Sequence, residues 1–215
     1  MHLLCLAFAL GAAALARAQQ HDKPNGLFLI AKPSLADPNF RRTVVLVTQT
    51  PDASTVGVIV NRPTRLRLSQ FLTDEFATHN YRAPLYFGGP VMRQAIVALL
   101  RSESAPSHAA FHVLKGVYLT MHADNIQKLL AEPGPRYRLY AGFAGWAPRQ
   151  LESELAREDW FVLPADAEML FRRDTEGLWE ELVKKASRPS PQTRAIEDIG
   201  AEAGILRLST ATAIR

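Results

Sequence analysis

The feature that most constrains the fold is a pair of β-branched runs, TVVLV and TVGVIV, which begin at Thr43 and Thr55. The turn-forming tetrapeptide PDAS, residues 51–54, stands between them. β-Branched residues favour strands, and two such runs joined by a short polar loop are typical of a β-hairpin. The sequence therefore predicts an antiparallel hairpin around which the rest of a sheet must form.

Further apolar runs predict additional strands, with helices inserted between them at irregular intervals. The expected strands are 27–31, 85–89, 95–102, 116–121, 136–146 (ended by its glycines) and 160–164. The expected helices are a short one between Pro33 and Pro38, one capped by Ser69 that presents Leu72 and Phe76, one at 123–131, one starting at Pro148, and one at 175–186. The 85–89 and 95–102 strands are expected to pair with each other. This order indicates an α+β fold rather than a regular βαβ alternation.

The N-terminal segment resembles a cleaved export signal. Residues 3–16 are an apolar run, too short to span a bilayer, and Ala16-Arg17-Ala18 is a small-x-small cleavage pattern before Gln19. We therefore expect residues 1–18 to be a signal peptide, residues 19–186 the folded domain, and residues 187–215 a linker and loosely docked tail. The expected location is periplasmic or secreted, with a cytoplasmic location as the alternative. The single cysteine, Cys5, would be removed with the signal, and no transmembrane anchor is expected in the mature chain.

Charge does not point to nucleic acid as a partner. The chain has 25 basic and 21 acidic residues, and they are spread along its length. The densest basic spacing is Arg62, Arg65 and Arg67, where Pro63 interrupts any continuous helix. We expect an exposed loop there and no nucleic-acid binding.

The residues that carry chemistry form only weak patterns. The sequence has no Walker loop, no G-x-G-x-x-G, no G-x-S-x-G and no H-E-x-x-H. His108 and His112 have helical spacing and would hold a metal only if His122 or Asp124 joined them, so we expect solvated histidines, no metal and no cofactor.

Two other residue pairs offer catalytic alternatives. Glu154 and Glu158 share a helix face with basic neighbours, which is typical of a solvated surface, and Ser34 with Asp37 fits a turn better than a hydrolase. No catalytic residue is assigned.

Five segments together carry a family resemblance: FLIAKPSLADPNFRRTVVLV, VGVIVNRP, YFGGPV, GVYLT and AGFAGWAPRQLESEL. In this order and spacing they resemble the YqgE/AlgH family of bacterial proteins. The resemblance implies a compact single domain around a strongly twisted, bulged mixed sheet with short helices packed on it. It implies no settled activity, although members are often labelled transcriptional regulators. The matching motif positions are Pro33, Ser34, Asp37, Gly57, Asn61, Pro63, Gly88, Gly89, Pro90, Val91, Gly142, Gly145, Trp146 and Pro148.

The glycine motifs suggest a site. If the corners at Gly88-Gly89-Pro90 and Gly142–Trp146 lie together, they would line a groove beside an indole and the following helix, where an anion could sit near Arg149. The groove residues would be Gly88, Gly89, Pro90, Gly142, Gly145, Trp146 and Arg149. The expected function is an exported, non-catalytic binding or regulatory protein that acts on another protein or a small anionic ligand. A cytoplasmic regulator is the alternative, and a hydrolase is the third possibility.

Overall fold

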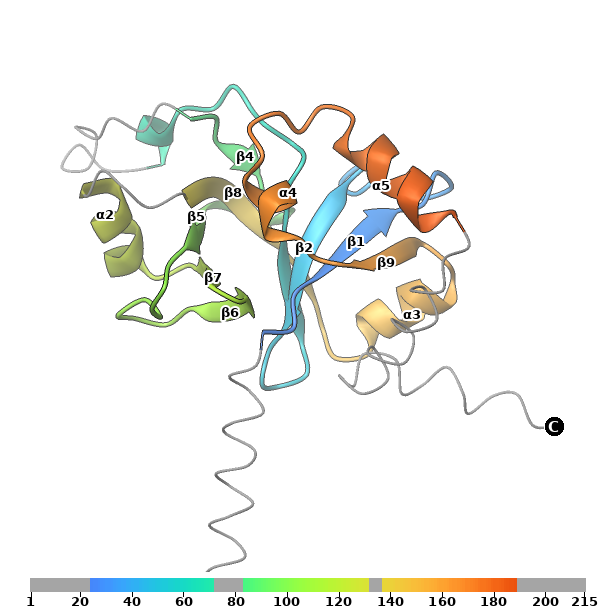
Figure 1. Ribbon diagram of the computed structural model, residues 1–215, viewed down its shortest axis with the longest axis horizontal. Coiled ribbons are helices and arrows are strands. Elements are labelled where there is room, and N and C mark those ends of the chain that lie inside the picture. Colours follow the sequence, from blue (N-terminus) through green and yellow to red (C-terminus); the bar gives the residue numbers. More distant parts are fainter. Residues whose placement is uncertain (1–23, 72–82, 132–136, 189–215) are drawn as a thin grey trace, which may run out of the picture.

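The computed structural model describes residues 24–71, 83–131 and 137–188, which form one sheet with helices against it (Figure 1). The strands are β1 (Leu27–Ala31), β2 (Val44–Gln49), β3 (Thr55–Ile59), β4 (Tyr86–Phe87), β5 (Val91–Arg101), β6 (Phe111–Leu114), β7 (Val117–Thr120), β8 (Tyr137–Trp146) and β9 (Trp160–Pro164). The helices are the 3-10 turn η1 (Leu68–Gln70) and the α-helices α2 (Ala123–Ala131), α3 (Gln150–Ala156), α4 (Ala167–Phe171) and α5 (Leu178–Ala186). The α+β class is confirmed.

The predicted hairpin is the centre of one half of the sheet. Strands β2 and β3 pair antiparallel, with Val45 opposite Ile59 and Gln49 opposite Thr55. The full strand order is β6-β7-β5-β8-β3-β2-β1-β9, and the short β4 pairs with β8 outside this path. The pairs are antiparallel except β4 with β8, which is parallel, so the sheet is mixed.

The sheet curls so that its two halves face each other. The Gly26 N–H donates to the Val113 carbonyl at 2.7 Å, which ties the start of β1 to β6 across the interior. The enclosed core contains residues of β1, β2, β5, β7 and β8 and is covered by Leu170 of α4 and Leu178 and Leu182 of α5. On the outer side, α2 covers one half of the sheet and α3 the other. Figure 1 shows α2 and α3 at opposite ends of the molecule.

Strand β8 departs from the sequence prediction, because its glycines do not end it. The strand runs through Gly142, whose φ of 70° accommodates a local irregularity, and continues to Trp146. Its pairing with β5 shifts register between Val91 and Ile96, which is the bulge expected near the Gly-Gly-Pro motif. The predicted pairing of 85–89 with 95–102 is wrong, since β4 and β5 each pair with β8 instead.

The shorter elements were predicted less well. Residues 33–42 form turns rather than a helix, Ser69 lies within η1 rather than capping a helix, and α5 begins at Leu178 rather than Thr175. Helix α4 and strand β6 were not predicted. Helix α2 and strand β9 are confirmed at the predicted bounds.

Several expectations lie outside the described residues: the signal peptide at 1–18, the helix positions of Leu72 and Phe76, and the tail from residue 189 onward. Within the described ranges, every helix falls short of the length and apolarity that crossing a membrane requires.

Candidate functional site

The two glycine corners do lie together, but they pack backbone against backbone. The Gly88 N–H donates to the Ala141 carbonyl at 2.9 Å, and the Gly88 carbonyl accepts from Ile59 N–H at 2.9 Å. A Cβ on Gly142 would lie 2.7 Å from the Gly89 carbonyl oxygen. These glycines therefore allow two main-chain segments to cross in close contact, which is a structural reason for the motif.

The remaining residues of the predicted groove are placed differently from one another. Pro90 is half-buried at the crossing, Gly145 is exposed, and Trp146 is only 3% exposed within the core beneath α3. Arg149 is exposed and takes the left-handed N-cap position of α3, with φ of 67°. Anion binding beside Arg149 stays a prediction.

The Trp146 indole is hydrogen-bonded to a half-buried carboxylate. One oxygen of Glu154, Oε2, accepts from the indole N–H of both Trp146 and Trp160, each at 2.9 Å, while Oε1 accepts from Gln150 at 3.2 Å. Glu158 has left the helix and pairs with Lys32 at 3.5 Å on the surface. The two glutamates of the catalytic alternative therefore engage different partners, and Glu154 has a structural role.

The other motif residues also stabilise the backbone. Asn61 accepts from the Val44 N–H at 2.9 Å and donates to the Arg42 carbonyl at 3.0 Å. Asp37 accepts from the Asn39 N–H at 2.7 Å, which makes it a turn residue. Pro63 forms an isolated bridge with Tyr86.

Most of the remaining motif positions lie at turns and strand ends. Pro33, Ser34 and Pro148 are exposed in turns and Val91 begins β5, whereas Gly57 lies in the middle of β3 opposite Val47.

The Arg62 side chain also makes hydrogen bonds within the fold. Its guanidinium donates to the carbonyls of Asn39 at 2.6 Å and Arg41 at 2.9 Å, and burial lowers its pKa. Arg65 and Arg67 are exposed beside it. The three arginines that are closely spaced in the sequence therefore have different roles. Arg62 holds a turn, and Arg65 and Arg67 lie on the surface.

The described residues also form an open cleft at a place where the sequence predicted no site. It has a volume of about 1100 Å³ and lies between the start of β8, the approach to β4, and α4 with the turn that follows it. Its lining residues are Ala83, Pro84, Tyr86, Tyr137, Arg138, Glu168, Met169, Phe171, Arg172 and Arg173. We call it the β8–α4 cleft.

Arg138 is the buried charge of this cleft. It is 7% exposed, and its guanidinium lies 4.4 Å from the centre of the Tyr86 ring. It donates to the Arg172 carbonyl at 2.6 Å and, at 3.5 Å, to the Val60 carbonyl. Among the described residues, no carboxylate lies within 4.0 Å of it. A buried guanidinium held only by carbonyls and a ring retains a positive field that an anion would neutralise.

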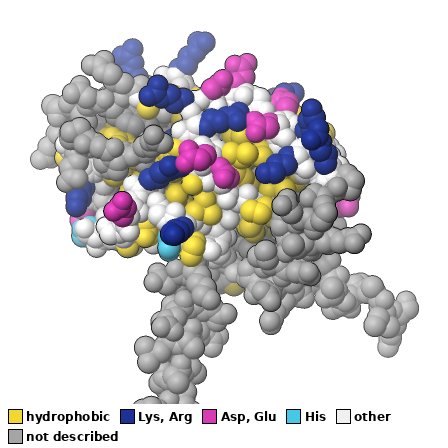
Figure 2. All heavy atoms as spheres, in the orientation of Figure 1, with side chains coloured by type: hydrophobic (Ala, Val, Ile, Leu, Met, Phe, Trp, Pro, Cys, Tyr) yellow, Lys and Arg dark blue, Asp and Glu magenta, His cyan; other side chains and the backbone are white. Residues whose placement is uncertain are grey.

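The rest of the cleft combines positive charge with apolar surface. Arg172 forms an ion pair with Glu181 at 2.7 Å, and Glu168 forms one with Arg101 at 2.7 Å. Burial raises the pKa of Tyr137 above its ordinary value, so its phenol stays protonated even in mildly alkaline solution. Figure 2 shows basic, acidic and apolar side chains interspersed on the face in view. The cleft thus suits a molecule with one anionic group and an apolar part.

The sequence feature nearest to this cleft is Arg138, whose burial becomes evident only in the structure. Arg138 lies within a strand that alternates it with Tyr137 and Leu139, and β8 is buried on both faces. A charged side chain in a strand covered on both sides must be buried whichever face it takes, and buried charges are often functional.

The structure groups the histidines differently from the sequence prediction. His108, His122 and Asp124 come together, with their ligand atoms within 4.8 Å of one another. His112 does not join them, because it lies in β6 and stacks on Tyr118 with ring centres 4.8 Å apart.

Comparison with known proteins adds a family and a fold. The AlgH-like family model matches residues 28–190. A UPF0301 protein of Myxococcus xanthus is 35% identical over 160 residues, covering 73% of this chain and 87% of that protein. A UPF0301 protein of Thermobifida fusca is 34% identical over 169 residues, covering 74% and 85%.

Two solved structures resemble the fold. The solution structure of the AlgH protein from Pseudomonas aeruginosa has a TM-score of 0.63 and 28% identity, and covers 76% of this chain and 89% of that one. The crystal structure of DIP2367 from Corynebacterium diphtheriae has a TM-score of 0.61 and 23% identity, with 80% and 90% covered.

Proposed function

The chain belongs to the AlgH-like family, and on that premise we propose that it is an exported, non-catalytic binding protein that takes a small anionic ligand in the β8–α4 cleft. The observation that carries the proposal is Arg138, a guanidinium buried at the cleft without a carboxylate partner among the described residues. A buried charge without a counter-charge raises the free energy of the protein. An anion bound beside it would lower that free energy, and this gain would appear as binding affinity.

The ligand class follows from the lining. Arg138 and Arg173 supply positive charge, Tyr137 supplies a neutral hydroxyl, and Met169 and Phe171 supply apolar surface. A phosphate or carboxylate joined to an aromatic or aliphatic group matches these three features. The proposal favours binding over catalysis because the glutamate expected in an acidic pair, Glu154, is engaged by two indoles.

Arg138→Met is expected to reduce the affinity for phenyl phosphate by about 10-fold to 100-fold, because a charge-assisted hydrogen bond contributes about 1.5–3 kcal/mol. The aliphatic part of methionine retains much of the buried packing. Binding is measured by calorimetry and by amide chemical shifts of the β8–α4 cleft residues.

The matched control is Arg157→Met, which removes one positive charge from an exposed position that pairs with Asp159 at 3.0 Å. It should leave the affinity unchanged, and benzyl alcohol, which has the ring without the phosphate, should bind the wild type far more weakly. Equal affinities in Arg138→Met and Arg157→Met would remove the cleft as the anion site.

Export rests on the N-terminal sequence, whose apolar run and Ala16-Arg17-Ala18 pattern match a cleavable signal. The mature protein is expected to begin at Gln19 in the envelope or secreted fraction. Intact mass and N-terminal sequencing of the protein from fractionated native cells test this. A full-length chain in the cytosol would overturn export and favour the cytoplasmic alternative.

A further inference from the structure

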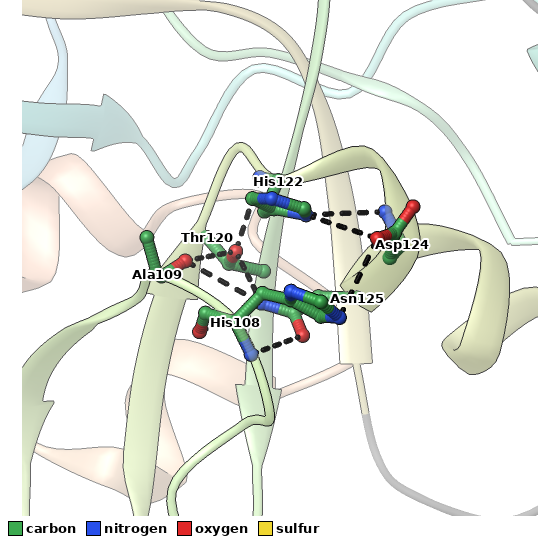
Figure 3. A network of polar contacts seen from close by, with 6 residues as sticks. All are labelled: His108, Ala109, Thr120, His122, Asp124 and Asn125. Atoms are coloured by element: carbon green, nitrogen blue, oxygen red, sulfur yellow. Dashed lines mark hydrogen bonds and ion pairs between the residues drawn. The ribbon is translucent and has the colours of Figure 1, made fainter.

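A second polar cluster lies on the opposite side of the sheet from α4 and α5, beside α2. His108 comes from the loop before β6, His122 immediately precedes α2, and Asp124 lies in the first turn of α2 (Figure 3). Figure 3 shows the two imidazoles one above the other with the Asp124 carboxylate beside them. From the sequence, His122 and Asp124 were expected only as possible additions to a pair formed by His108 and His112.

The spacing of the three side chains is close to that of ligands around one ion. Asp124 Oδ2 lies 3.4 Å from His108 Nε2 and 3.9 Å from His122 Nδ1. Two ligand atoms on a tetrahedral Zn²⁺ with bonds of about 2.0–2.1 Å lie roughly 3.3 Å apart. The carboxylate is therefore near the position at which it would share an ion with both rings.

The Nδ1 nitrogen of His122 makes a hydrogen bond within the cluster. It accepts the Asp124 N–H at 3.3 Å, so an ion bound at this nitrogen would replace that hydrogen bond. An unprotonated imidazole nitrogen is the form that binds a metal.

A buried asparagine fixes the segment that carries His108. Asn125 is 5% exposed and accepts from the His108 N–H at 3.2 Å, while its amide donates to the His108 carbonyl at 3.1 Å. The same amide donates to Thr120 Oγ1 at 3.0 Å, and Thr120 also receives the His122 N–H at 3.2 Å. One buried network thus holds the backbones of both histidines, which is the kind of support that orients metal ligands.

We propose that His108, His122 and Asp124 bind a divalent first-row transition-metal ion of the Zn²⁺ type. Two imidazole nitrogens with one carboxylate oxygen suit Zn²⁺ and its neighbours better than Mg²⁺ or Ca²⁺, which prefer oxygen ligands alone. Three protein ligands leave at least one coordination position for water, which gives an open site at the surface.

Binding requires the rings to turn toward each other. The imidazole planes are within 12° of parallel with centres 4.4 Å apart, so their in-plane lone pairs do not yet converge. The side chains of His108 and His122 are 44% and 40% exposed, which leaves room for this rotation. The held backbone and the movable rings together make a site that closes on the ion.

The test is a titration of the full chain with Zn²⁺ by calorimetry, together with its variants His108→Gln, His122→Gln and Asp124→Asn. Each variant is expected to lower the Zn²⁺ affinity by at least about 10-fold, since loss of even an orienting contact costs 10-fold to 100-fold. In the wild type, Zn²⁺ should shift the imidazole NMR signals of His108 and His122 and leave those of His112 in place.

The matched control is His112→Gln, which removes a histidine of the same segment that lies outside the cluster. All chains retain His2, His21 and His79, so differences among them report the cluster alone. Far-UV circular dichroism without metal verifies folding. An affinity that is the same in wild type and all three ligand variants, or imidazole shifts at His112 rather than at His108 and His122, would overturn the proposal.

Discussion

Replacing Gly88 with alanine is expected to lower the free energy of unfolding by about 4 kcal/mol, which is large for a single added methyl group. A Cβ at this position would lie well inside van der Waals distance of the Gly142 carbonyl oxygen and 2.9 Å from Tyr140 Cβ. The obstructing atoms belong to the backbone of β8 and to the first atom of a buried side chain, so neither can rotate away. The two main-chain segments must therefore move apart, which breaks the Gly88–Ala141 and Ile59–Gly88 hydrogen bonds. Urea denaturation followed by circular dichroism measures the change.

Two other glycines provide controls for this prediction. The Cβ of Gly145→Ala would contact only side-chain atoms, the Phe143 ring at 3.4 Å and Val91 Cγ2 at 3.9 Å, so this variant should change stability little. Gly177→Ala has nothing within 4 Å but a φ of 71°, so it should cost about 1–2 kcal/mol from the left-handed conformation alone. If Gly88→Ala lowers the free energy of unfolding no more than Gly177→Ala does, the glycine motif is not needed for close backbone contact.

The parts of the fold that were predictable from sequence are those set by local patterns. The β2–β3 hairpin follows from two β-branched runs and a polar turn, and α2 follows from the spacing of Ile126, Leu129 and Leu130. The Gly-Gly-Pro stretch was correctly expected to accompany a bulge, since glycine permits close backbone approach. Each of these inferences needed only residues that are near one another in the chain.

The errors arise where distant segments decide the outcome. Gly142 looks like the end of a strand, yet β8 continues because β3 and β5 hydrogen-bond to it on either side. Tyr86 and Phe87 were expected to pair with the next strand, but they pair parallel to Tyr140 and Ala141, more than fifty residues away. Helix α4 is a five-residue segment held by Leu170 in the core, too short for a periodic signal.

The candidate sites show the same limit. The sequence drew attention to His108, but its separation from His122 and Asp124 concealed which histidine was the true neighbour. Arg138 was visible only as one member of an alternating strand, because burial on both faces of β8 depends on α2, α4 and α5 packing from elsewhere. Chemical patterns that fold together from separate elements cannot be paired by spacing alone.

Glu154→Leu is expected to lower the free energy of unfolding by about 3 kcal/mol, because it leaves two buried indole N–H groups without an acceptor. Trp146 and Trp160 are 3% and 4% exposed, so water does not readily replace the carboxylate oxygen. Phe40 packs against both rings, with centres 5.8 and 5.6 Å away, so loosening of the indoles should spread through this cluster. Tryptophan fluorescence during urea denaturation reports both the stability and the environment of the rings.

Glu154→Gln separates the hydrogen bonds from the charge. The glutamine carbonyl oxygen can still accept from both indoles, so this variant should retain most of the stability that leucine loses. Glu152→Leu makes the same change in the first turn of α3 and should have little effect. If Glu154→Leu is as stable as Glu152→Leu, the indoles do not depend on the carboxylate and Glu154 is free to act in chemistry after all. If Glu154→Gln is instead as unstable as Glu154→Leu, the negative charge itself stabilises the cluster, and the carboxylate must be ionised to hold the two tryptophans together.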